Sequence, residues 1–228
     1  MRILFWTTVA LFLFQCGWSS PVRAADWKVE ALKEGPKGLS PEMTAAIQEA
    51  GYRISGSAGT VCDVWLAKEV PLKPKFKSTL RIKYPFLTGE LVGAIHFPDS
   101  SKPGDFRGQA LKPGTYTLRY GLQPDDGNHL GTSEIRDFLV GCPPKTDVDP
   151  KRIEDIQKLF KLSGTSAGTT HPAIFLLYPP ASKPFGAPAV RHDDEKNLLI
   201  LDANANGKEG DAGVSVPISL VTVGKSEG

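Results

Sequence analysis

The sequence predicts a mainly β protein, built as an antiparallel, immunoglobulin-like β-sandwich or as a partly open barrel. Three observations support this fold class. The 228 residues include 23 glycines and 19 prolines, so turns are frequent. The segments between the turns mostly alternate apolar and polar residues, which is the pattern of strands with one buried face. Only two segments, residues 41–50 and 150–163, carry helical signals.

The chain begins with a predicted signal peptide. Arg2 is followed by an apolar run at 3–14, and residues 22–24 read Val-Arg-Ala, which are the parts of a secretory signal. The run is shorter than the roughly 20 residues that a membrane-spanning helix needs. We therefore expect cleavage after Ala24 and export to the periplasm or the exterior. A retained anchor and lipidation of Cys16 are the alternatives.

Cleavage would leave 204 residues, which we expect to fold as one domain over 25–223 with a disordered tail at 224–228. Loss of Arg2 and Arg23 leaves 25 basic side chains against 25 acidic ones, so the net charge is near zero. We therefore expect no nucleic-acid partner, because its recognition depends on a basic surface. After the signal peptide, no apolar run approaches the length of a membrane span.

Ten segments carry the strand pattern. The clearest is 115–122, where apolar residues at the even positions alternate with Thr, Thr and Arg at the first three odd positions. In chain order, the predicted strands cover residues 27–32, 52–55, 60–66, 79–84, 90–97, 115–122, 135–141, 173–178, 197–202 and 214–223.

The two predicted helices have recognisable ends. Ser40 is a candidate N-cap, Pro41 suits the first turn, and Gly51 would end the first helix. The second would open at Pro150, has apolar residues at helical spacing, and would end at Gly164 as a left-handed cap.

A proline-glycine pair precedes the clearest strand. Pro113 and Gly114 suit the centre of a type II turn, which requires a positive φ at its second central residue. A turn of this kind leading into Tyr-Thr-Leu at 116–118 is similar to prealbumin-type and carboxypeptidase-regulatory-like β modules.

A larger set of segments resembles a family of exported, β-rich bacterial proteins without an established activity. The resemblance covers roughly residues 50–223. It implies export and a β-rich fold, and it implies no reaction. The segments that carry it are Gly51-Tyr52-Arg53, Trp65-Leu66, Phe106-Arg107-Gly108-Gln109, LKPGTYTLRYG at 111–121, QPDDGNHLG at 123–131, Arg136-Asp137-Phe138, Ser163-Gly164 and Thr170-His171-Pro172-Ala173.

Two cysteines remain after cleavage, Cys62 and Cys142, each in a predicted strand. An oxidising compartment and an even count permit one disulfide between them. Two free thiols buried in separate strands are the alternative.

One segment matches half of a calcium-binding loop. Asp202, Asn204 and Asn206 place oxygen ligands at alternate positions before a glycine, and calcium is the cofactor that they would hold. The twelfth position, where a bidentate acid should close the loop, is Gly213. The alternative is a hairpin turn at Asn206-Gly207.

A ligand site is predicted around two histidines in loops. His129 and His171 each lie beside Gly or Pro, and Asp126, Arg136 and Asp137 lie near them in the sequence. If the strands at 115–122 and 173–178 run antiparallel, both loops lie at the same end of the fold. The structural alternative is that Arg119 or Arg136 pairs with Asp137 across neighbouring strands.

These residues lead to three functional hypotheses. The favoured one is a non-catalytic module that binds a ligand or an envelope protein through its loops. An enzyme or metal site converging on His129, His171, Arg136 and Asp137 is the second, and a structural envelope component is the third. The string Gly-x-Ser-x-Gly at 164–168 does not predict a hydrolase, because a helix precedes it and a strand follows, the reverse of a nucleophile elbow.

Overall fold

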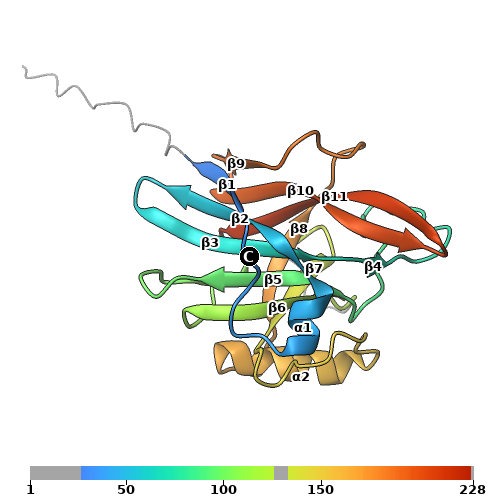
Figure 1. Cartoon of the computed structure of the whole chain (residues 1–228), viewed down its shortest axis with the longest axis horizontal. Helices are drawn as coiled ribbons and strands as arrows, with labels where there is room; N and C mark the ends of the chain where they lie inside the picture. Colours follow the sequence, from blue (N-terminus) through green and yellow to red (C-terminus); the bar gives the residue numbers. More distant parts are fainter. Residues whose placement is uncertain (1–26, 126–132, 227–228) are drawn as a thin grey trace, which may run out of the picture.

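The computed structural model describes residues 27–125 and 133–226, so the predicted signal peptide lies outside the described residues. Within these ranges the chain forms one long, mostly antiparallel sheet and two helices (Figure 1). The helices are α1 (Pro41–Ala46) and α2 (Ile156–Ala167). The strands are β1 (Lys28–Leu32), β2 (Ile47–Gly56), β3 (Gly59–Ala67), β4 (Val70–Pro71), β5 (Leu91–Phe97), β6 (Gly114–Leu122), β7 (Asp137–Cys142), β8 (Ala173–Tyr178), β9 (Ala189–Asp193), β10 (Leu198–Glu209) and β11 (Ala212–Val223).

The sheet curls into a nearly closed barrel. Its strands follow the order β1-β2-β3-β5-β6-β7-β8-β11-β10-β4, and β9 also pairs with β10. Trp27, directly before β1, stacks on His192 of β9 with ring centroids 6.2 Å apart. This aromatic contact brings the two ends of the sheet together, because β1 and β9 come from opposite ends of the strand order.

Alternation along the strands builds the core. Inward-facing side chains of β3, β5, β6, β8, β10 and β11 pack in one large apolar cluster, which includes Tyr116, Leu118 and Tyr120 from β6. Phe97 and Phe175 stack across this interior at 6.1 Å. The prediction of a mainly antiparallel β fold is therefore confirmed, and the immunoglobulin-like arrangement stays a prediction.

One predicted strand is wrong. Residues 79–84 alternate in sequence but form a loop, in which the Thr79 hydroxyl accepts hydrogen bonds from the amides of Arg81 and Ile82. Leu80 is 89% exposed, and Tyr84 is the buried end of the segment. The alternation did not lead to a strand because the local turn at Thr79 uses the backbone groups that a neighbouring strand would need.

The C-terminal hairpin is longer than predicted. β10 runs through Asn206 and Gly207 to Glu209, and the turn lies at Gly210, which has a φ of 60°. A turn at Asn206-Gly207 is therefore wrong. Beyond β11, the amide of Ser226 donates to the carbonyl of Phe106 at 2.7 Å, so residues 224–226 lie against the barrel where a disordered tail was expected.

Both helices differ from their predicted bounds. Ser40 caps α1 as expected, accepting from the amide of Met43 at 3.1 Å, but the helix ends before Ile47 because residues 47–50 join β2. Asp155 caps α2, and Gly168 is its left-handed cap with a φ of 66°. Gly164 lies inside α2, where a Cβ atom would come within 2.8 Å of the carbonyl oxygen of residue 169. Gly164 therefore allows the close packing of residue 169 against α2 and does not end the helix.

α2 lies against the outer face of the barrel. Leu159 packs with Val140 and Cys142 of β7, and the Ser163 hydroxyl donates to the carbonyl of Gly141 at 2.7 Å. Among the described residues, neither helix has the length and apolar character needed to cross a membrane. The helix instead forms one wall of the cleft described next.

Candidate ligand-binding cleft

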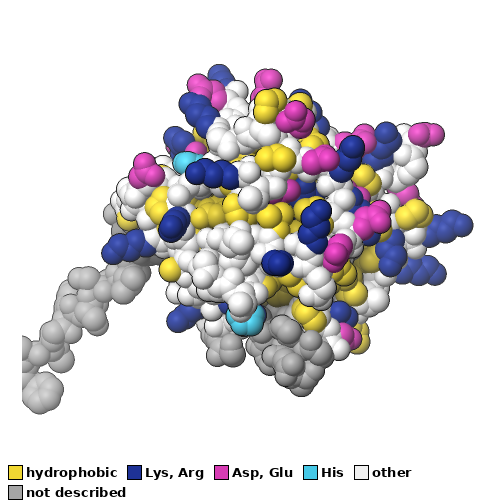
Figure 2. All heavy atoms as spheres, turned by 90° about the horizontal axis from the view of Figure 1, so that it is seen from below, with side chains coloured by type: hydrophobic (Ala, Val, Ile, Leu, Met, Phe, Trp, Pro, Cys, Tyr) yellow, Lys and Arg dark blue, Asp and Glu magenta, His cyan; other side chains and the backbone are white. Residues whose placement is uncertain are grey.

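A cleft of about 690 Å³ lies between α2 and the outer face of β6, β7 and β8. Its volume falls within the range of roughly 300–1,000 Å³ that is typical of small-molecule sites. Figure 2 views the protein from the side of α2, and on this face hydrophobic side chains lie exposed among charged side chains of both signs. The cleft therefore has an apolar interior and lies on a face that carries charged side chains.

The floor of the cleft is apolar because it is the outward-facing side of buried strands. Phe138 and Val140 project from β7 and Ile174 projects from β8, while Phe160 contributes from α2. Gly121 of β6 keeps part of the floor open. A Cβ atom at this position would lie 2.6 Å from Cγ2 of Val140 and 3.7 Å from the ring of Phe160.

One wall is a stripe along α2. Gln157, Lys161 and Thr165 are four residues apart and therefore share a helix face, and all three line the cleft. The opposite face of α2 packs on β7 through Leu159. This face places an amide, an ammonium group and a hydroxyl along the apolar floor.

The other wall is a turn held by a buried carboxylate. Asp105 is 1% exposed and accepts four hydrogen bonds, from the amides of Arg107, Gln109 and Ile174 and from the side-chain amide of Gln109. Gln109 also donates to the carbonyl of Pro172 at 3.1 Å. These contacts fix the turn that carries Arg107 against the start of β8.

The cleft has basic groups and no acidic ones among its lining residues. Among the described residues that line it are Arg107, Lys161 and His171, and none of these described lining residues is Asp or Glu. An anionic group bound there would meet complementary charge next to a low-dielectric floor, where such interactions are strengthened.

The structure places the predicted site residues in different surroundings. His129 and Asp126 lie outside the described residues. His171 is exposed and lines the cleft. Arg136 bonds instead to the carbonyl of Gln123 and to Asp125, at 2.8 and 3.2 Å.

The predicted antiparallel placement of the strands at 115–122 and 173–178 is wrong. β6 and β8 both pair antiparallel with β7, so they run parallel to each other. Leu122 pairs with Asp137, while Ala173 pairs with Gly141 four residues along β7, which is about 13 Å at the spacing of a strand. His171 therefore lies beside the C-terminal end of β7, whereas Asp137 lies at its N-terminal end. The predicted convergence on one site is wrong for His171, Arg136 and Asp137.

Asp137 is part of the core, not of a surface site. Its carboxylate accepts from the amides of Lys83 and Tyr84, at 2.7 and 3.1 Å, and from the hydroxyl of Tyr120 at 2.5 Å. Burial raises the pKa of Asp137, and these hydrogen bonds, which favour the charged form, only partly offset that effect. The hydroxyl of Tyr84 continues the network by donating to the carbonyl of Tyr178 at 2.7 Å.

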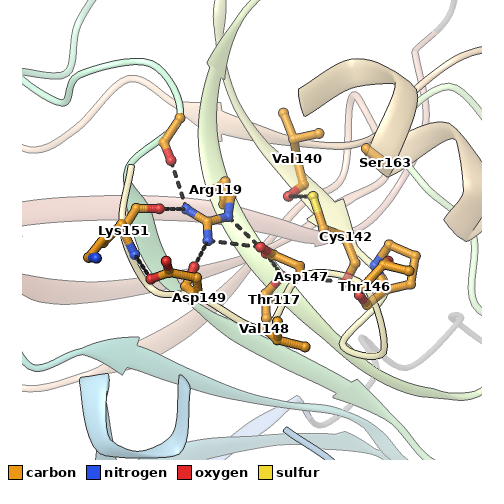
Figure 3. A network of polar contacts seen from close by, with 12 residues as sticks. Thr117, Arg119, Val140, Cys142, Thr146, Asp147, Val148, Asp149, Lys151 and Ser163 are labelled. Carbon is orange, nitrogen blue, oxygen red and sulfur yellow. Dashed lines mark hydrogen bonds and ion pairs between the residues drawn. The ribbon is translucent and has the colours of Figure 1, made fainter. Parts of the chain in front are cut away.

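Neither predicted arginine partner of Asp137 is observed. Arg119 is completely buried on the outer face of β6, and its guanidinium binds Asp147 through Nε and Nη2, each at 2.8 Å (Figure 3). The remaining N–H groups donate to the carbonyls of Gly89, Asp149 and Lys151 at 2.6–2.9 Å. All five guanidinium donors are used, so Arg119 binds the segment around 147–151 to the barrel and is not available to a ligand.

The candidate calcium residues do not form a loop. Asp202, Asn204 and Asn206 lie on β10, and each is bound within the protein. Asp202 accepts from Arg191 and from the hydroxyl of Ser219, and Asn204 bonds to the backbone of residue 185 in both directions. Over residues 27–125 and 133–226, no three His, Cys, Asp or Glu side chains gather as a metal site would require.

The cysteines are free. Cys62 lies inside the barrel on β3, and Cys142 lies outside it, beneath α2 on β7. Two strands separate β3 from β7, so at about 4.8 Å per strand the cysteines are too far apart for a disulfide. Burial raises the pKa of both thiols, which suits apolar packing and not reactivity.

Sequence reasoning missed most of the cleft. Arg107 and Lys161 were not predicted as ligand-binding groups, and no residue of the predicted helix at 150–163 was. The signal that could have found Lys161 is the spacing of Gln157, Lys161 and Thr165, which gives α2 a polar stripe beside its apolar face.

Comparison with known proteins yields no matching family model, no matching curated protein and no matching solved structure. The functional assignment therefore depends on the geometry of the cleft.

Proposed function

We propose that this is an exported, non-catalytic ligand-binding protein whose ligand occupies the cleft between α2 and strands β6–β8. The observation that carries the proposal is an apolar floor enclosed by polar and basic side chains, which is the composition of small-molecule sites. The floor and one wall belong to strands and a helix, and the turn at Arg107 is fixed by the four hydrogen bonds to Asp105. Such a site is formed before the ligand arrives.

A second cavity of about 660 Å³ supports the proposal less well. It lies beside the start of β3 and the end of β11 and is lined largely by connecting segments and by residues 222–226. Its walls are held mainly by loops, whereas the cleft is built on strands and a helix. Sites built on regular elements are the better preorganised ones.

Filling the cleft should prevent binding. Thr165 is exposed and lines the cleft, so Thr165→Trp places an indole over the floor. With Nile red, a neutral apolar dye, we expect fluorescence titration to give one site per chain and Thr165→Trp to weaken it about tenfold or more, because the dye and the indole compete for the same volume.

Ile156→Trp is the matched control, because Ile156 is exposed on the same helix but does not line the cleft. Its affinity for Nile red should equal that of the wild type. Equal dye binding by all three proteins, with unchanged melting temperatures, would show that the cleft binds nothing.

Export is tested separately by the mass of the mature chain. Protein recovered from the envelope or the medium should begin at Ala25, because signal peptidase cuts after small residues spaced as at 22 and 24. Intact mass spectrometry measures this directly. A chain that keeps Met1, or one with an acylated Cys16, would contradict the proposal of a cleaved leader.

A further inference from the structure

We propose that the ligand of the cleft is a small amphiphile with one carboxylate, whose apolar body lies on the floor and whose carboxylate binds Arg107 and Lys161. This inference rests on the proposed function and assigns its ligand class. The two cations come from opposite walls of the cleft, Arg107 from the turn held by Asp105 and Lys161 from α2.

Both cations are available to a ligand. Within the part of the chain that the structure describes, the side chains of Arg107 and Lys161 form no hydrogen bond and no ion pair with another residue. Both residues are exposed. A guanidinium offers a planar pair of donors that matches a carboxylate, and an ammonium adds a second charge.

The nearby carboxylates cannot neutralise these cations. Asp105 is buried and its two oxygens already accept four hydrogen bonds. Asp125 pairs with Arg81 and Arg136. Asp155 accepts from the amides of Gln157 and Lys158 at the start of α2, so these three carboxylates already have partners within the protein.

The floor specifies the rest of the ligand. Phe138, Val140, Ile174 and Phe160 present only carbon to the cleft, so a fully hydrated polyanion would leave them unused. The amides at the start of α2, which could otherwise hold a phosphate, are taken by the side chain of Asp155. One anionic group at the edge of an apolar body fits both parts of the site.

The test compares three ligands that share one alkyl chain: dodecanoate, dodecanol and dodecylammonium. Each displaces Nile red from the wild type and from Arg107→Gln/Lys161→Gln, below the concentration at which micelles form. We expect the wild type to bind dodecanoate about tenfold or more tightly than dodecanol, and dodecylammonium most weakly, as charge-assisted hydrogen bonds require.

The double variant should bind dodecanol and Nile red as the wild type does but lose its preference for dodecanoate. Arg152→Gln/Lys158→Gln is the control, because it removes one arginine and one lysine that are exposed outside the cleft, and it should keep the preference. Melting temperatures establish that all three proteins are folded.

Two outcomes overturn the inference while leaving the proposed function intact. Equal affinity of the wild type for dodecanoate and dodecanol shows that the cleft does not select an anion. A preference that persists in Arg107→Gln/Lys161→Gln places the carboxylate elsewhere. Failure of the proposed function itself is recognised independently, when Thr165→Trp has no effect on the neutral dye.

Discussion

Replacing Arg119 by methionine should lower the free energy of unfolding by about 3–5 kcal/mol, the usual loss when one partner of a buried ion pair is removed. The substitution leaves the carboxylate of Asp147 buried with only the hydroxyl of Thr117 as a side-chain donor. It also removes the donors to three backbone carbonyls. Urea denaturation monitored by tryptophan fluorescence measures the change.

Arg81→Met is the control for the loss of an arginine. Arg81 pairs with Asp125 at 2.8 Å on the surface, with both side chains well exposed, so its removal should cost about 1 kcal/mol or less. Adding Asp147→Leu to Arg119→Met should recover part of the stability, because the second change removes the unpaired charge. Equal losses for Arg119→Met and Arg81→Met would contradict the structural role of the buried pair.

Asp137→Ala should be the second most damaging change, at about 3 kcal/mol, because it leaves the amides of Lys83 and Tyr84 and the hydroxyl of Tyr120 without their shared acceptor. Tyr120→Phe removes only one of these donors and should cost about 1 kcal/mol. The comparison separates loss of the acceptor from loss of a single bond. Thermal or urea unfolding gives both values.

The same carboxyl group should make stability depend on pH. Because burial raises the pKa of folded Asp137 above its unfolded value, its contribution is fully present below pH about 4 and is lost as the pH rises through the folded pKa. The stability of the wild type relative to Asp137→Asn should therefore be greatest in acid and decrease with pH. A difference that increases with pH would reverse the direction assigned to this shift.

Strand alternation predicted the fold because it reports which side chains face the core. It succeeded for β6, where Tyr116, Leu118 and Tyr120 pack inside, whereas β7 and β8 are buried along nearly their whole length and do not alternate. The second half of β10 was missed although it alternates, with Ala203 and Ala205 buried between Asn204 and Asn206, because these polar residues were assigned to a calcium loop or a turn. The side-chain amide of Asn206 donates to the carbonyl of Lys68, which is 138 positions away. A contact between such distant residues cannot be predicted from the local sequence pattern.

The cleft was less predictable because its lining comes from five parts of the chain: the turn at Arg107, β6, β7, α2 and the start of β8. The loop position of His171 was enough to select it as a candidate, and it does line the cleft. Arg107 becomes a candidate only when Asp105 is seen to hold its turn against β8. Arg119 misleads in the opposite direction. A charged residue at a polar position of an alternating strand suggests exposure, but the segment around 147–151 buries Arg119 completely.

The order of strands also bears on how the chain can fold as it emerges. β2, β3, β5, β6, β7 and β8 each pair with the preceding strand in the sequence, apart from the short β4, so this part of the sheet can grow in chain order. The contact between Trp27 and His192 joins residues that are far apart in the chain and bears a large entropic cost of loop closure. Until β9, β10 and β11 have been added, β8 is an unpaired edge strand. The apolar inner face of the sheet is then not covered by β10 and β11. We therefore expect barrel closure to be a late step of folding and a truncated chain that ends after β8 to associate through its open edge.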